Sequence, residues 1–206
     1  MPPIKSISTE QAILEAAEKL FLDKGYAKTS TTEIARLAGC NQALVHYYYR
    51  SKDNLFRVIF ENKVKMFVSS LLQISEDGIP FEEKLKRRIS SHFDMLKANK
   101  KLPILLFNEV STNAELAQKL IENVVHLPLS IVAQIQLELD DEFEQGRLCK
   151  TDAKSLLYAI FSMNVMAFMS APILKLVVHA TDEQFDRLLE KRKAENITFI
   201  LKSLKP

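Results

Sequence analysis

The chain has 206 residues, of which 47% are hydrophobic and 26% charged, with 28 Lys and Arg against 26 Asp and Glu. This balance is typical of a globular protein and excludes a disordered or collagen-like chain. Only four glycines and two cysteines occur, all widely spaced, which excludes a glycine-rich phosphate loop, a zinc knuckle and a disulfide framework. We therefore expect an all-α protein of the cytoplasm that holds no metal and no cofactor.

Helical periodicity begins close to the N-terminus. Ser8 and Gln11 form a candidate capping box, and the following apolar residues keep to one helical face until Gly25, where a helix can end. A second candidate capping box, Ser30 with Glu33, opens a short helix. Two helices are therefore predicted before residue 39.

A turn and two further helices follow. Gly39 suits a left-handed turn, and Asn41 can cap a short helix that reaches Tyr49. After Ser51 the apolar residues recur every three or four positions up to an Asp-Gly turn at residue 77. This spacing predicts one long amphipathic helix.

The rest of the chain also has helical periodicity. The pattern predicts helices over residues 81–96, 103–110, 116–143, 152–170 and 182–204. Pro128 is expected to kink or split the third of these, because proline cannot continue a helix. The whole chain thus has about nine predicted helices and no convincing strand.

Residues 155–174 carry no formal charge, and a segment of this length could span a bilayer. Ser162, Asn164 and Pro172 interrupt the segment, and no polybasic flank orients it. A helix buried in a helical interface has the same composition. A membrane-attached adaptor nevertheless stays open as an alternative.

The first three short helices, with Gly39 between the second and the third, describe a helix-turn-helix. Such a motif places the start of its last helix against base edges in the major groove of DNA. Residues 28–52 hold four basic residues and one acidic residue. A modest basic patch of this kind suits contact with a polyanion.

One dense series of short motifs occupies this region: Gly25-Tyr26, Thr29 to Thr32, Ile34-Ala35, Ala38-Gly39, Val45-His46-Tyr47-Tyr48-Tyr49 and Ser51-Lys52-Asp53 with Leu55. On these motifs, residues 8–56 resemble the DNA-binding domain of the TetR (tetracycline-repressor-like) family of bacterial transcription regulators. The resemblance implies a DNA-binding domain over residues 1–55 and a helical ligand-binding and dimerisation domain over 56–206. It also implies a homodimeric repressor that a small-molecule inducer releases from a palindromic operator in double-stranded DNA.

The same resemblance implies a set of DNA-binding residues. They are Thr31, Thr32, Gln42, Ala43, Leu44, His46, Tyr47 and Lys52. Gln42 can pair with the N6 and N7 atoms of adenine, and Leu44 can meet a thymine methyl group. Tyr47 and Lys52 are expected to hold phosphates. His46 departs from the pattern, because most relatives have a phosphate-bonding tyrosine there.

For the second domain, the resemblance implies a ligand pocket and a dimer interface. The candidate pocket residues are Phe67, His92, Phe93, Asn108, His126, Met163, Asn164 and Phe168. Their apolar members supply adaptable surface and their polar members supply anchors. The last two predicted helices are expected to pair with their copies as a four-helix interface.

A helical enzyme remains an alternative to the regulator. None of the four histidines has a metal-binding spacing, and no sequence-local nucleophile or base is visible. Catalytic sets can, however, be assembled from residues that are distant in sequence.

Overall fold

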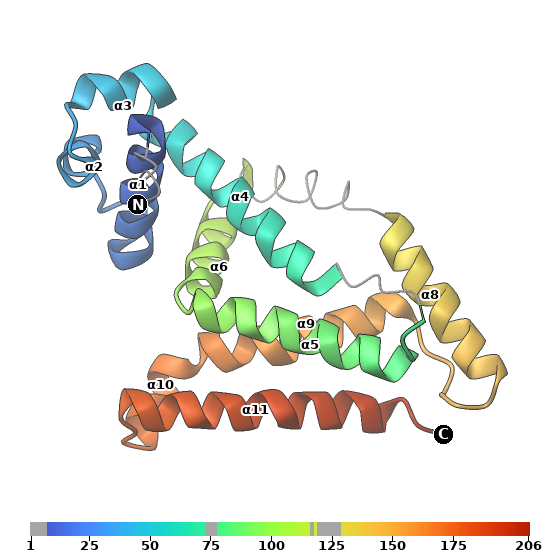
Figure 1. Cartoon of the computed structure of the whole chain (residues 1–206). Helices are drawn as coiled ribbons and strands as arrows, with labels where there is room; N and C mark the ends of the chain where they lie inside the picture. Colours follow the sequence, from blue (N-terminus) through green and yellow to red (C-terminus); the bar gives the residue numbers. More distant parts are fainter. Residues whose placement is uncertain (1–7, 73–77, 116–117, 119–128) are drawn as a thin grey trace, which may run out of the picture.

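The computed structural model describes residues 8–72, 78–115, 118 and 129–206. Within these ranges the chain forms ten helices and no strand, which confirms the all-α prediction. Three short helices form a compact head, a long helix leads out of it, and the remaining helices pack into a body (Figure 1).

The head consists of α1 (Thr9–Lys24), α2 (Thr31–Ala38) and α3 (Gln42–Tyr49). The predicted capping box at Ser30 and Glu33 is complete. Only one half of the capping box predicted at Ser8 forms. The Ser8 hydroxyl accepts a hydrogen bond from the Gln11 backbone nitrogen, but the Gln11 side chain donates to Glu15 and does not return to Ser8. Gly39 ends α2 in the left-handed conformation, with φ of 69°, which turns the chain into α3.

The long helix α4 (Lys52–Leu72) connects the head to the body, where it packs along α5 (Figure 1). Four further long helices and two short ones follow. They are α5 (Phe81–Ala98), α6 (Leu102–Thr112), α8 (Leu129–Glu144), α9 (Ala153–Met169), α10 (Ala171–Val177) and α11 (Asp182–Ser203). The helix predicted over residues 116–143 is described only from Leu129 onward, so the predicted split at Pro128 lies outside the described residues.

Buried side chains gather in one core in the head and two in the body. The head core joins α1, α2 and α3 to the first half of α4, as far as Val64, and Leu105 of α6 packs into it from the body. The domain boundary predicted after residue 55 therefore falls inside α4, in the middle of a continuous apolar contact. In the body, α5 and α9 contribute to both cores, and α11 packs across them.

The uncharged segment forms α9 and α10, with Pro172 in the first turn of α10. No single helix within the described ranges is long and apolar enough to cross a membrane. Taken together, α9 and α10 satisfy length and composition, but they meet at a bend of 54°.

Candidate functional site

The turn between α2 and α3 is built by two local interactions. Gly39 provides the left-handed residue, and the Asn41 side chain accepts a hydrogen bond from the Leu44 backbone at 3.0 Å. The predicted helix-turn-helix is thus formed. The alternation of buried and exposed residues along α3 leaves Gln42, Ala43, His46 and Tyr47 exposed and buries Val45 and Tyr49 in the head core.

Side chains predicted to contact DNA lie together where α2 and α3 begin. The Gln42 amide nitrogen donates to Thr31 Oγ1 at 2.9 Å, and Thr32 Oγ1 donates to the Gln42 amide oxygen at 3.2 Å. Gln42 is therefore held in one orientation by two hydroxyl groups. The amide still has a second N–H donor and a second oxygen lone pair, which are the groups that a bidentate contact to adenine uses.

His46 is exposed one turn after Gln42. Its Nδ1 lies 3.1 Å from the carbonyl oxygen of Arg50, which only accepts hydrogen bonds, so Nδ1 carries the proton. Its Nε2 points toward the Gln42 amide nitrogen at 3.5 Å. The His46 ring, at a position where the resemblance leads us to expect a tyrosine, is thereby anchored to the end of its own helix.

The three tyrosines of α3 have different environments. Tyr47 is 77% exposed and packs edge-on against Tyr48, which is also exposed, with ring centroids 5.1 Å apart. Tyr49 is buried, and its hydroxyl donates to the Glu10 carbonyl oxygen of α1 at 3.3 Å. Tyr47 and Tyr48 are thus both on the exposed side of α3. The sequence singled out Tyr47 alone, because nothing in a run of three tyrosines distinguishes Tyr48.

Two members of the predicted DNA-binding set have roles inside the head. Lys52 is half-buried, and its ammonium donates to the carbonyl oxygens of Tyr26 and Thr29 at 3.2 and 3.1 Å. It also lies 4.1 Å from the centroid of the Tyr26 ring. Leu44 is half-buried and packs against the head core. Contacts of Lys52 with phosphate and of Leu44 with thymine stay predictions.

We expect Lys52→Ala to destabilise the free protein as well as weaken DNA binding. Two carbonyl oxygens lose a charged donor, a loss of about 1–3 kcal/mol. Thermal unfolding without DNA measures this loss, and the salt dependence of binding reports any lost phosphate contact. Lys28→Ala, at an exposed lysine of the same basic stretch, is the matched control. An unchanged melting temperature for Lys52→Ala would contradict the structural role.

The candidate pocket residues do not gather around one cavity within the described ranges. His92, Phe93, Asn164 and Phe168 are fully buried and belong to packed helix contacts. Asn108 is exposed, and Met163 lies in a groove described below. His126 and the side chain of Phe67 lie outside the described part of the chain. The pocket remains a prediction.

His92 and Asn164 form a buried polar cluster with Asn196, which we call the His92 cluster. The Asn164 amide nitrogen donates to the Ile89 carbonyl oxygen at 3.0 Å and lies 3.2 Å from His92 Nδ1. Asn196 of α11 donates to the Asn164 amide oxygen at 2.9 Å. Because the nitrogen facing Nδ1 is a donor, that ring atom is unprotonated, and burial lowers the pKa of His92 to about 4.

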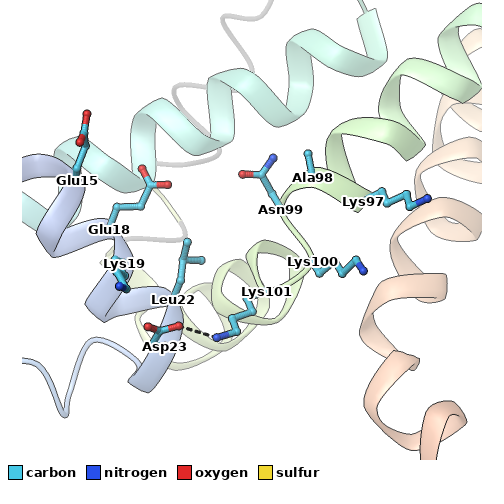
Figure 2. Close-up of a pocket in the computed structure, with 10 residues that line it drawn as sticks. All are labelled: Glu15, Glu18, Lys19, Leu22, Asp23, Lys97, Ala98, Asn99, Lys100 and Lys101. Carbon is cyan, nitrogen blue, oxygen red and sulfur yellow. Dashed lines mark hydrogen bonds and ion pairs between the residues drawn. The ribbon is translucent and has the colours of Figure 1, made fainter. Parts of the chain in front are cut away.

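An open, largely charged groove of about 610 Å³ lies where the head meets the body, between α1 and the turn that joins α5 to α6 (Figure 2). Lys101 in this turn pairs with Asp23 of α1 at 2.6 Å. Lys97 and Lys100 point the other way and pair with Glu190 and Asp186 of α11, each at 2.6 Å. One turn therefore connects the first helix of the head with the last helix of the body.

A second groove, of about 620 Å³, runs between α9, α10 and α11, and its lining is mainly apolar. Its residues include Met163, Met166, Leu174, Val178 and Leu188. No residue of α10 is buried, and Phe199 of α11 is 59% exposed. Exposed apolar side chains gathered in this way are typical of protein interaction surfaces.

The described residues hold no candidate metal site. No group of three or more His, Cys, Asp or Glu side chains with a metal-binding arrangement occurs there.

Two family models match the chain over consecutive ranges. Residues 13–59 match the model described as bacterial regulatory proteins, tetR family, and residues 60–180 match the C-terminal region of YsiA-like proteins. The first range contains the helix-turn-helix, and the second covers most of the body.

Curated relatives are transcription regulators by name. The uncharacterised HTH-type regulator YhgD of Bacillus subtilis is 26% identical over 78% of this chain and 82% of its own length. The fatty acid metabolism regulator protein of the same organism is 28% identical over 53% of this chain and 57% of its own length.

Solved structures share the fold. A transcriptional regulator from Streptomyces coelicolor aligns with a TM-score of 0.68 at 21% identity, over 97% of this chain and all of its own. The fatty acid degradation regulator FadR from Bacillus halodurans aligns with a TM-score of 0.62 at 20% identity, over 94% and 97%. These likenesses concern the fold alone.

Proposed function

The chain belongs to the TetR family of bacterial regulatory proteins, and from that premise we propose that it is a repressor whose homodimer binds a palindromic operator and leaves it when a small molecule binds. As a helix-turn-helix transcription regulator it acts on DNA, so we place its work in the cytoplasm. The helical enzyme and the membrane adaptor gain no support from the family or from the named relatives.

One observation carries the DNA-binding part of this proposal. Gln42, His46 and Tyr47 stand exposed on one end of the head, with Gln42 fixed by Thr31 and Thr32. A recognition helix held in this way can present its first turn to base edges while flanking hydroxyls meet the phosphates. Two heads spaced by about 34–36 Å read two successive turns of one DNA face.

Selection of genomic DNA fragments on the purified, full-length protein tests the proposal. We expect the enriched fragments to share two inverted half-sites with centres about one or a few helical turns apart. Enrichment that depends on salt but has no common sequence would leave non-specific DNA binding only and would remove the operator from the proposal.

Gln42→Ala is expected to cost about 1–3 kcal/mol at the selected operator and to relax the preference at one base pair in each half-site. The selection, repeated with the variant, gives both quantities. Gln11→Ala makes the same change at an exposed glutamine of α1 and serves as the control. If the Gln42 variant selects the same sequences with the same preferences, α3 does not read bases through this residue.

The apolar groove between α9, α10 and α11 supports the dimeric part of the proposal. Exposed Met166, Leu188 and Phe199 give this face a composition typical of homodimer interfaces. A two-fold contact places the same face of both copies together, so one apolar surface suffices for both.

The inducer part rests on the family and on α4. This helix begins beside the recognition helix, contributes to the head core, and ends along α5 in the body. A ligand that binds two head spacings with different affinity shifts the protein between them, with a typical coupling of about 1–3 kcal/mol. By reciprocity, operator DNA must weaken binding of the inducer by the same factor, which calorimetry with and without operator measures.

A further inference from the structure

A buried arginine in the body has incomplete hydrogen bonding. Arg88 lies on α5 and is only 2% exposed. Neither its Nε nor its Nη1 has a hydrogen-bond partner among the described residues. Buried polar groups are nearly always hydrogen-bonded, and an arginine side chain keeps its positive charge inside proteins. Two bare donors on a buried cation therefore require an explanation.

The charges around Arg88 do not neutralise it. Glu138 of α8 is the carboxylate that favours its charged form, against the burial that lowers the pKa of the guanidinium. That carboxylate is already paired: its Oε1 lies 2.7 Å from the ammonium of Lys84, one turn before Arg88 on α5. His92, one turn after Arg88, is neutral at pH 7 because burial lowers its pKa to about 4. Two cations thus share one carboxylate.

The remaining surroundings are apolar. Leu85 and Ile89, the neighbours of Arg88 on the same side of α5, are fully buried. They pack in one core with Ile135 and Leu139, which flank Glu138 on α8. An unbalanced charge in such a core is unfavourable unless another group completes it.

We propose that Arg88 anchors the oxyanion of the effector, a small amphiphile with a carboxylate or a phosphate on an apolar body. A guanidinium offers two forks of parallel N–H donors, Nε with Nη2 and Nη1 with Nη2, and each fork matches the two oxygens of either group. Each fork of Arg88 includes one of the nitrogens without a partner. The aliphatic side chains on both sides of Arg88 suit the apolar body of such a ligand. This inference rests on the proposed function, because it names the chemical class of the molecule that would release the operator.

Three probes with the same chain test the site: decanoate, decyl phosphate and 1-decanol, each titrated calorimetrically into the full-length protein without DNA. We expect at least one of the two anions to bind ten-fold or more tightly than the alcohol. The comparison between carboxylate and phosphate identifies which head group the site prefers. Equal affinities for all three probes, or no binding of either anion, would overturn the proposal.

The matched variants are Arg88→Gln and Arg87→Gln. Arg87 is the neighbouring arginine, half exposed and bonded to Glu83 at 3.2 Å. We expect Arg88→Gln to lower anion affinity at least ten-fold and to leave the affinity for decanol unchanged, whereas Arg87→Gln keeps the preference for anions. An Arg88→Gln protein that still prefers the anions would show that they bind elsewhere.

Thermal unfolding separates this role from a structural one. Removal of an uncompensated buried charge is expected to leave the melting temperature unchanged or higher. A large fall in melting temperature, produced equally by Arg88→Gln and Glu138→Gln, would instead identify a structural pair between these two residues and overturn the proposal.

Release of operator DNA is measured in a separate experiment, so the two proposals can fail independently. Anions that bind through Arg88 but leave the operator complex intact would keep this site and remove its effector role. Operator release by uncharged compounds alone, identical in wild type and Arg88→Gln, would keep the inducible repressor and remove the anion anchor.

Discussion

Glutamate in place of Phe199 is expected to convert the proposed dimer into a monomer that binds the operator about 100- to 10,000-fold more weakly. Phe199 is exposed on α11, the helix that lines the apolar groove with α9 and α10. In a two-fold interface the substitution would bury two unpaired carboxylates, each at a cost of several kcal/mol. Two separate heads would then lose the high effective concentration that linkage in one dimer gives them.

Light scattering measures the oligomeric state, and titration of the operator measures the loss of affinity. Leu137→Glu, at an apolar residue of α8 that is 71% exposed, is the matched control and should leave assembly unchanged. The adjacent Ile200 is unsuitable as a test, since it is buried in the protomer's own core and its replacement would affect folding. A Phe199→Glu protein that remains dimeric would move the interface to another face.

His92 is expected to cost the protein about 3 kcal/mol of stability as the pH falls from 7 to 4. In the unfolded chain a histidine binds a proton below a pKa of about 6.5, whereas burial holds the pKa of folded His92 at about 4. Between these values the unfolded state binds more protons, so acid favours unfolding. The stabilisation is fully present above pH 6.5 and is lost progressively down to pH 4.

Urea unfolding at a series of pH values measures this dependence. His92→Gln removes the titrating ring and is expected to flatten the curve between pH 6.5 and pH 4. Because the variant also loses the contact between the His92 ring and Asn164, it is expected to be less stable than the wild type at pH 7. Leu137→Gln, at an exposed residue of α8 whose side chain does not titrate, should follow the wild-type curve. Parallel curves for His92→Gln and the wild type would show that His92 is not held neutral.

Features that depend on neighbouring residues were predicted well from the sequence. The caps at Ser30 and Asn41 each join a side chain to a backbone nitrogen three positions later. Their spacing alone therefore specifies them. The exposed positions of α3 follow from the same kind of rule, because helical periodicity decides which residues the head core takes.

Features that depend on distant residues were not predictable from local patterns. The family resemblance implied a phosphate contact for Lys52, which stays a prediction. Local patterns did not show that its ammonium bonds carbonyl oxygens more than twenty positions earlier. His92 and Asn164 were predicted as polar anchors of the ligand pocket that the resemblance implies. Their pairing with Asn196 becomes visible only when α11 is placed against α5 and α9.

Three lysines where α5 leads into α6 have a consequence for the construction of chimeric regulators. Lys101 belongs to the body but bonds Asp23 of the head, and its neighbours Lys97 and Lys100 bond α11. Exposed ion pairs add little stability, and one turn later Leu105 of α6 packs into the head core, so the ion pair and this apolar contact together join the head to the body. A foreign head grafted before α4 would therefore need apolar residues that fit the first half of α4 and Leu105. It would also need an acidic residue at the place of Asp23 on α1 to keep this contact with the body.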